Sequence, residues 1–146
     1  SSTKIRNSIN EGDLKTTKTY LGRFFSLTGK VVKGDGLGKQ INYPTANISI
    51  EEDYKIIPKD GVYYIKTTID NKLYNGMMNI GHRPTIGTKE KSIEVNLFSF
   101  DKDIYDKVIS VDVVEKIREE KKFSSIEALK TQLAKDEEHC LKLINK

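Results

Sequence analysis

The stretch GVYYIKTTIDNKLYNGMMNI, residues 61–80, contains two runs of apolar and β-branched residues separated by Asp70-Asn71. Val, Ile, Thr and Tyr are enriched in β-strands, and the first run, 61–69, consists mostly of these residues. Asp and Asn both tolerate positive φ, which a two-residue hairpin turn requires. We therefore predict a β-hairpin with strands at 61–69 and 72–80.

Similar patterns flank this hairpin on both sides. From their apolar and β-branched residues we predict further strands at 24–33, in a short piece within 44–48, at 93–100 and at 107–117. Turns and irregular loops join these runs. The sequence therefore favours a mainly β fold, with a closed antiparallel barrel preferred over a βαβ sheet.

Helices are predicted at both ends of the chain. A helix over 3–11, capped by Ser2 and ended by Gly12, precedes a second helix over about 13–20, which Gly22 ends. These two helices carry few apolar residues in one stripe, so we expect removal of the first helix to leave the barrel core intact.

The last predicted helix is long. Ser124-Ser125-Ile126-Glu127 matches a capping box, in which Ser and Glu side chains satisfy backbone N–H groups at a helix start. An apolar stripe at helical spacing follows, made of Ile126, Leu129, Leu133, Cys140 and Ile144.

Composition excludes several classes of protein. The 146 residues fit one domain of ordinary size, and the apolar runs are too short for a transmembrane helix. Cys140 is the single cysteine and His82 and His139 are the two histidines, which excludes a disulfide framework and argues against a zinc site. The first residues have no signal-peptide pattern, so we expect a cytoplasmic protein without membrane partners.

The net charge of +4 arises from 25 Lys and Arg against 21 Asp and Glu. Lysines alternate with acidic residues along the chain, which is typical of a solvated surface rather than of a basic patch. Only four residues are Arg, and they are scattered. Because nucleic-acid binders usually cluster their cations and use Arg to read bases, we expect no nucleic-acid partner.

A glycine-rich segment, Gly34-Asp35-Gly36-Leu37-Gly38-Lys39, could fold its backbone amides around phosphate oxygens. It lacks the spacing of a Walker A loop, and no helix pattern follows it as a dinucleotide-binding turn would need. Taken alone, the segment is equally consistent with a glycine-rich hairpin.

Thr45, Asn47 and Glu94 are the other polar candidates. In an extended chain Thr45 and Asn47 face the same way, and their hydroxyl and amide oxygens suit Mg²⁺; a strand-entry turn is the alternative. Alternation directs Ile93, Val95 and Leu97 to one face of their strand, and Glu94 and Asn96 to the other. There a carboxylate meets either solvent or a ligand. Arg118, at the end of a strand, could clamp a ligand or bind backbone carbonyls.

An ordered set of short motifs runs along the chain: GKVVKGD at 29–35, PTAN at 44–47, GVY at 61–63, NIG at 79–81, RPT at 83–85, EVNL at 94–97, IREEKKF at 117–123 and LKTQLAKD at 129–136. In this order and spacing the set resembles the riboflavin kinase family over about residues 20–140. The first residues, with Gly12-Asp13 and Leu21-Gly22-Arg23, are similar to the junction in bacterial bifunctional riboflavin kinase/FAD synthetases.

The resemblance implies a Greek-key barrel that uses ATP and Mg²⁺ to phosphorylate the ribityl 5'-hydroxyl of riboflavin, giving FMN and ADP. It implies that 1–20 are a remnant or linker of a preceding FMN adenylyltransferase module absent from this chain, and that 21–146 are the kinase domain. Departures from the family pattern are Lys39 for a common Arg, Asn42 for a common Gly and Asn96 for a common His.

Carried over to this chain, the resemblance assigns roles to single residues. It makes Glu94 the general base and gives the metal to Thr45 and Asn47. It gives the nucleotide to Gly34, Asp35, Gly36, Gly38, Lys39, Asn79 and Tyr105. It gives the flavin to Ile117, Arg118 and Phe123. Two rival interpretations remain: a flavin-binding module without kinase activity, and an RNA-binding barrel, which the scattered Arg residues disfavour.

Overall fold

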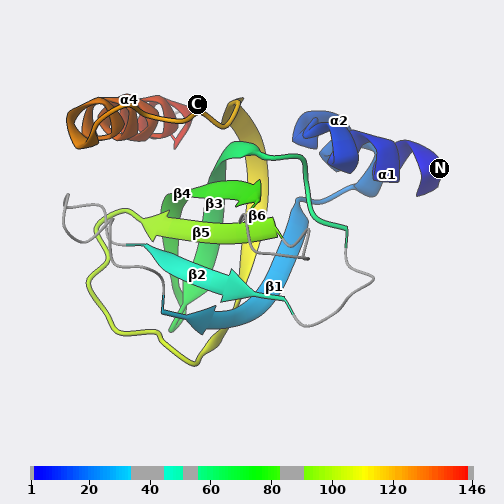
Figure 1. Ribbon diagram of the computed structural model, residues 1–146. Helices are drawn as coiled ribbons and strands as arrows, with labels where there is room; N and C mark the ends of the chain where they lie inside the picture. Colours follow the sequence, from blue (N-terminus) through cyan, green and yellow to red (C-terminus); the bar gives the residue numbers. More distant parts are fainter. Residues whose placement is uncertain (1, 34–44, 51–55, 83–90, 145–146) are drawn as a thin grey trace.

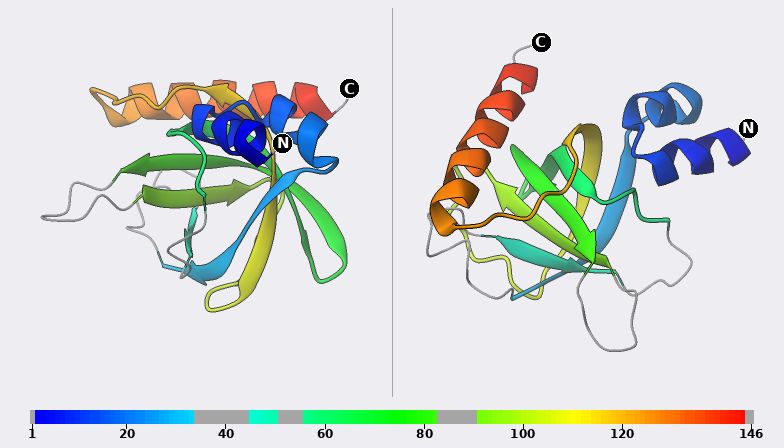
Figure 2. Two further views of the ribbon diagram at one scale, coloured as in Figure 1. Left: turned by 90° about the vertical axis from the view of Figure 1, so that its right-hand side faces the viewer. Right: turned by 45° about the horizontal axis from the view of Figure 1, so that its top comes forward.

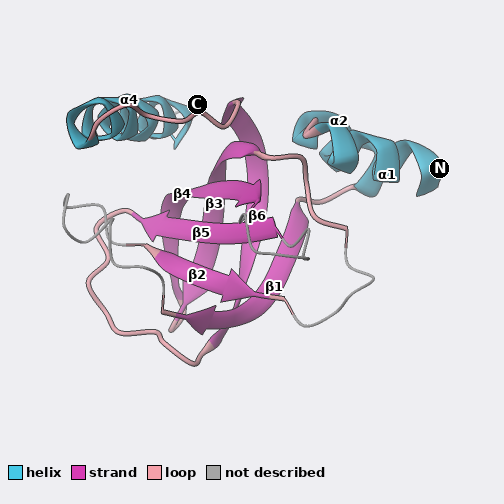
Figure 3. Cartoon of the chain, in the orientation of Figure 1, coloured by secondary structure: helices cyan, strands magenta, loops and turns pink. Residues whose placement is uncertain are grey.

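The computed structural model describes residues 2–33, 45–50, 56–82 and 91–144. Figure 1 and Figure 3 show the elements of this part of the chain. In chain order they are α1 (Ser2–Glu11), α2 (Leu14–Leu21), β1 (Phe25–Val32), β2 (Ala46–Ser49), β3 (Gly61–Ile69), β4 (Lys72–His82), β5 (Lys91–Leu97), β6 (Val108–Arg118) and α4 (Ile126–Ile144).

The strands of the described residues close into one barrel in the order β1-β2-β5-β4-β3-β6, and every neighbouring pair is antiparallel. The predicted mainly β fold, with short helices in front and a long helix behind, is therefore confirmed. The order also places β2 beside β5, although β3 and β4 lie between them in the sequence (Figure 1).

The β3–β4 hairpin forms as predicted. Asp70 and Asn71 have φ values of 50° and 66°, and Ile69 pairs with Lys72 across the turn. Left-handed φ at both central residues gives the turn a twist that matches that of the strands it joins.

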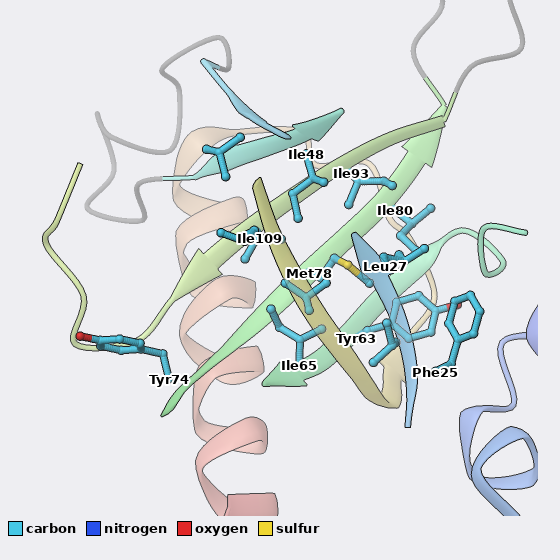
Figure 4. Close-up of a cluster of buried hydrophobic side chains, with 14 of the residues drawn as sticks. Phe25, Leu27, Ile48, Tyr63, Ile65, Tyr74, Met78, Ile80, Ile93 and Ile109 are labelled. Carbon is cyan, nitrogen blue, oxygen red and sulfur yellow. The ribbon is translucent and has the colours of Figure 1, made fainter. Parts of the chain in front are cut away.

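The barrel interior holds the main hydrophobic core. Alternate residues of the strands point inward, and Leu27, Ile65, Met78 and Ile80 are completely buried there. Figure 4 shows these side chains meeting from different strands. Burial of one strand face fixes the register, because a slip by one residue would turn every inward side chain outward.

The outer face of the barrel carries a second cluster beneath α4, which packs on β4 and β6. Val62, Tyr64, Met77 and Cys140 are its buried members. The pairing of β3 with β6 skips Val114 and Ile117 at two irregularities, and both skipped residues pack against this cluster. Bulges of this kind bend a strand and redirect side chains.

The helices α1 and α2 contribute to the main core. Ile9 and Leu14 are 3% and 2% exposed and belong to the same cluster as the barrel interior. The Ser8 and Thr17 hydroxyls are 2.7 Å apart and hydrogen-bonded in a buried position, which joins the two helices. Apolar residues are few in these helices, as expected, but Ile9 belongs to the main core, so the expectation that this core is independent of the first helix is wrong. Figure 2 shows them on a different side of the barrel from α4.

Several predicted boundaries of the elements need correction. The first helix already includes Ser2, so Ser2 is not its cap. The strand predicted at 93–100 is β5, which starts at Lys91 and ends at Leu97. Its alternation stops there because Phe98 donates its N–H to Asn75 and Ser99 has a φ of 55°.

At the start of α4 the cap is also different from the prediction. The Ser125 hydroxyl accepts from the N–H of Ala128, so Ser125 is the capping residue, and Glu127 lies one position too early for the predicted box. Ile126 and Ile144, the predicted ends of the apolar stripe, are 53% and 36% exposed. The buried residues of this helix are Asp136 and Cys140.

Candidate active site

Three polar residues form a row across adjacent strands on the outer face of the barrel. Asn47 of β2 is the direct partner of Glu94 of β5, and Glu94 is the direct partner of Asn79 of β4. Direct cross-strand partners share a face and have Cβ atoms about 5 Å apart. The inward neighbours Ile48, Val95 and Ile80 belong to the core, which leaves the outer face to the row.

The row combines hydrogen-bonding capacity with partial burial. Asn47 is 6% exposed, whereas Glu94 and Asn79 are half-buried. Asn96, two residues after Glu94 on the same face, is 8% exposed. A carboxylate held beside amides in a partly buried position can accept hydrogen bonds from a bound hydroxyl or take its proton.

A pocket of about 240 Å³ opens between β2, the end of β5 and the connection from β5 to β6. Thr45 and Tyr105 line it together with Phe100, Asp101 and Lys102, and with the apolar side chains of Ala46, Val95, Leu97, Ile104 and Ile109. The structure therefore brings a predicted metal residue and a predicted nucleotide residue to one cavity. Its apolar walls and few polar groups are typical of a small-molecule site.

Tyr105 also lies near the end of β1. The Lys33 ammonium is 5.6 Å from the centre of the Tyr105 ring, and Lys33 directly precedes residues 34–44. The predicted phosphate loop, with Gly34, Asp35, Gly36, Gly38 and Lys39, lies outside the described residues.

Arg118, the last residue of β6, faces the helix α4. Its Nε donates to Asp136 Oδ1 and Oδ2 at 2.8 and 3.0 Å, and its Nη2 donates to Oδ2 at 2.8 Å. Its Nη1 donates to the carbonyl oxygen of Glu119 at 3.0 Å. Of the two alternatives from the sequence, the contact with a backbone carbonyl is present, whereas the clamp on a ligand stays a prediction, because the carboxylate that Arg118 holds belongs to the chain itself.

The other two predicted flavin residues have different surroundings. Phe123 lies 5.8 Å from the Arg118 guanidinium carbon and lines a pocket of about 420 Å³ between residues 121–124 and the first turns of α4. Ile117 is the residue skipped at a β6 bulge and packs into the cluster beneath α4. Among the described residues Ile117 is not part of this pocket lining.

His82 does not join the polar row. It ends β4 on the face opposite to that of Asn79, and its Nδ1 is 2.5 Å from Asp60 Oδ2. Asp60 in turn is 3.5 Å from the Lys91 ammonium. These contacts connect the entry to β3 with the end of β4 and the start of β5. Among the described groups of the row itself, Glu94 is therefore the candidate base.

The chain matches a protein-family model. The model of the flavokinase family, described as riboflavin kinase, matches residues 21–144. The chain belongs to the riboflavin kinase family. The match covers the barrel and α4 and includes Asn47, Asn79 and Glu94, the three residues of the row.

Curated relatives of this riboflavin kinase family member are bifunctional enzymes. The bifunctional riboflavin kinase/FMN adenylyltransferase of Bacillus subtilis is 37% identical over 97% of the chain, and that of Haemophilus influenzae is 39% identical over 94%. The chain spans 46% and 44% of the length of these two relatives.

Solved structures include two informative neighbours. A Streptococcus pneumoniae protein described as a macrolide-efflux protein has a TM-score of 0.89 and 38% identity, with 94% of this chain and 45% of that chain covered. The riboflavin kinase of Trypanosoma brucei has a TM-score of 0.58 and 25% identity, with 85% and 82% covered. In the described part of the chain, each helix is too short or too polar to cross a membrane.

Sequence reasoning missed Asp136 and Gln132. Gln132 Nε2 donates to Asp136 Oδ1 at 2.9 Å, and Gln132 also lines the pocket that contains Phe123. The available signal was the helical spacing: Asp136 lies three residues after Leu133 and four before Cys140, within the apolar stripe. An acidic residue in such a stripe indicates a buried partner of opposite charge.

Proposed function

We propose that this domain transfers the γ-phosphoryl group of ATP to the ribityl 5'-hydroxyl of riboflavin, giving FMN and ADP. The observation that carries the proposal is the row of Asn47, Glu94 and Asn79 on three adjacent strands. It supplies a carboxylate flanked by amides in a chain of the riboflavin kinase family.

In this mechanism Glu94 receives the proton of the ribityl hydroxyl. The hydroxyl oxygen forms the new bond to the γ-phosphorus, the bond from phosphorus to the ADP oxygen breaks, and the hydroxyl proton moves to the Glu94 carboxylate. Phosphoryl transfer depends on positioning and on charge stabilisation more than on covalent participation of the protein. General-base assistance of this kind contributes about 10²–10⁴-fold to the rate.

The residues present fit a magnesium ion bound with the nucleotide. The Asn47 side-chain oxygen and the Thr45 hydroxyl are hard oxygen donors, and Mg²⁺ prefers few protein ligands together with phosphate oxygens and water. We infer that Thr45 and Asn47 hold it. When bound, Mg²⁺ neutralises phosphate charge.

The two pockets suggest where the substrates bind. The pocket with Thr45 and Tyr105 is assigned to the nucleotide. On the family resemblance, Asn79 and the segment 34–39, which lies outside the described residues, are assigned to the same substrate. The pocket with Phe123 is assigned to the flavin, with Arg118 beside it. We propose that the hydroxyl and the γ-phosphate meet at the row around Glu94.

We also propose that the domain acts in the cytoplasm, where the buried single Cys140 would stay reduced, and that its partners are riboflavin, FMN, ATP and ADP. The bifunctional relatives suggest that an FMN adenylyltransferase module accompanies it in a longer protein, with 21–146 as the kinase part and 1–20 leading into it.

The decisive experiment is incubation of the chain with riboflavin, ATP and Mg²⁺, followed by chromatography for FMN and FAD. FMN without FAD is expected. Riboflavin binding without FMN formation would favour a flavin-binding module, and FAD formation would contradict the assignment of adenylyltransferase chemistry to a separate module. Reactions without Mg²⁺ and with ADP in place of ATP serve as controls.

A further inference from the structure

The helix α4 carries a buried carboxylate whose oxygens are fully engaged. The Asp136 side chain is 4% exposed, Oδ1 accepts from Arg118 and Gln132, and Oδ2 accepts from Arg118 twice. A two-point Arg–carboxylate pair fixes the plane of the guanidinium as well as its position. Asp136 therefore holds Arg118 in one orientation.

In that orientation Arg118 also contacts the chain that follows β6. The remaining Arg118 nitrogen, Nη1, donates to the Glu119 carbonyl oxygen, and the guanidinium lies beside the Phe123 ring. Figure 1 shows the chain leaving β6 and passing along α4 before that helix begins. One guanidinium thus contacts the helix, the backbone of the departing segment and the aromatic side chain near the end of that segment.

The departing segment also touches the outer face that carries the polar row. A Cβ atom added to Gly81 would lie 2.9 Å from the Glu120 carboxyl carbon, so Glu120 packs directly on the bare backbone of β4. Gly81 lies two residues after Asn79, and its partner Ser92 lies two residues before Glu94. Same-face neighbours along a strand are about 7 Å apart. Glu120, within the segment 119–123, therefore lies in the immediate neighbourhood of the row.

We propose that Asp136 is a positioning residue for flavin binding, which acts by fixing Arg118 and, through it, the segment 119–123 beside the polar row. Gln132 extends this arrangement, because it binds Asp136 and lines the pocket with Phe123. The inference rests on the proposed riboflavin kinase function and adds to it a residue on a helix that carries none of the residues assigned to the chemistry.

The arrangement predicts that changes at Asp136 affect the binding of riboflavin but not that of the nucleotide. The pocket assigned to the flavin is lined by Gln132, which binds Asp136, and by Phe123, which lies beside Arg118. The pocket with Thr45 and Tyr105 is lined by β2, β5, the β5–β6 connection and the start of β6. Loss of the Asp136 charge should free the guanidinium and loosen the segment, without altering the nucleotide pocket. A purely structural role would lower thermal stability and leave the affinities of the folded enzyme unchanged.

The test is Asp136→Asn, compared with Glu138→Gln on the same helix. Glu138 is 69% exposed and 3.7 Å from Lys142, so the control removes a carboxylate from α4 without touching Arg118. We expect Asp136→Asn to raise the KM for riboflavin, and the riboflavin Kd from flavin fluorescence, by about tenfold. The KM for ATP and kcat should stay within about threefold, and Glu138→Gln should match the wild type.

A double-mutant cycle tests whether Asp136 affects riboflavin binding through Arg118. If Asp136 acts through Arg118, Arg118→Ala combined with Asp136→Asn should have the same riboflavin Kd as Arg118→Ala alone. The double variant should also be more stable than Arg118→Ala, since that single change leaves a buried carboxylate without its cation. Additive effects on Kd would overturn the proposal.

Two further variants keep the test decisive if Asp136→Asn does not fold. Asp136→Glu retains the charge but displaces the carboxylate by one methylene, and Gly81→Ala pushes Glu120 off β4 without changing α4. Each should raise the riboflavin Kd by about threefold or more. Unchanged riboflavin binding in both would refute the positioning role. If the wild type binds riboflavin but forms no FMN, the kinase proposal fails, while these binding measurements still decide the role of Asp136.

Discussion

Asn47 of β2 lies directly opposite Glu94 of β5, although the two residues are far apart in the sequence. The pairing exists because the short strand β2 inserts between β1 and β5 when the barrel closes. It places an amide and a carboxylate about 5 Å apart at Cβ on a partly buried outer face. The candidate chemistry therefore depends on barrel closure, and any change that loosens β2 should impair it.

Glu94→Gln tests the proposed base directly. Gln keeps the size and most of the hydrogen bonding but cannot take a proton, so kcat for FMN formation should fall by about two or more decades. Riboflavin affinity should stay within about threefold, because the carboxylate acts mainly in the transition state. Chromatography of FMN and fluorescence titration of riboflavin provide the two measurements.

A matched control for Glu94→Gln is Asp112→Asn on β6. Asp112 is also a strand carboxylate, but it accepts from the Ser26 hydroxyl at 2.6 Å, away from the polar row. Its change should leave kcat near the wild-type value. A Glu94→Gln enzyme with kcat within about threefold of wild type would show that Glu94 is only a solvated strand carboxylate.

Thr45 supplies a second test, through the metal. If its hydroxyl is a ligand, Thr45→Ala should raise the half-saturating Mg²⁺ concentration about tenfold, equivalent to about 1.4 kcal/mol. Thr45→Ser keeps the hydroxyl and should remain close to wild type. The measurement is FMN formation against free Mg²⁺ at saturating ATP. Superimposable curves for wild type and Thr45→Ala would remove Thr45 from the metal site.

The β3–β4 hairpin was predictable because the residues that determine it are neighbours in the sequence. Asp70 and Asn71 favour left-handed φ by their own chemistry, and the runs on either side have strand propensity, so turn and strands agree. The faces of β5 were predictable for the same reason: alternation alone separates Val95 from Glu94.

The assembly of the site could not be derived in that way. Periodicity shows that Glu94 and Asn47 each leave the core face, but it does not say which strands become neighbours. The order β2-β5-β4 arises from barrel closure, which depends on long-range packing. The resemblance to the riboflavin kinase family assigned the base to Glu94 and the metal to Asn47, and local sequence patterns could not assign these roles.

In the helix α4, the helical spacing of apolar residues did not predict correctly which side chains are buried. Counting apolar residues included Ile126 and Ile144, which are exposed, and omitted Asp136, which is buried. The burial of Asp136 becomes intelligible only with Arg118, a residue from another element. Hydrophobic periodicity does not reveal a buried charge whose partner lies elsewhere in the sequence.

The burial of Ile9 predicts that α1 contributes to stability. Ile9→Ala removes a side chain that is 3% exposed and packed in the main core, so it should lower the free energy of unfolding by about 2–4 kcal/mol. Asn10→Ala, at an exposed position on the same helix, should change it by less than about 0.5 kcal/mol. Urea unfolding followed by circular dichroism measures both. Equal free energies of unfolding for the two variants would show that the packing of Ile9 does not contribute to the stability of the domain.

Cys140 predicts a pH dependence of stability. Burial raises the pKa of its thiol from about 9 to about 12, and the nearby Asp136, Glu137 and Glu115 carboxylates act in the same direction. Below pH 9 the thiol is neutral in both states, so its contribution to stability is fully present. Above pH 9 it ionises in the unfolded chain first, and this contribution is lost as the pH rises toward 12, at up to about 1.4 kcal/mol per pH unit.

Urea unfolding at pH values from about 8 to about 10.5 measures this effect. The free energy of unfolding should fall more steeply with pH for wild type than for Cys140→Ala. Parallel curves would mean that the thiol ionises equally easily in the folded protein.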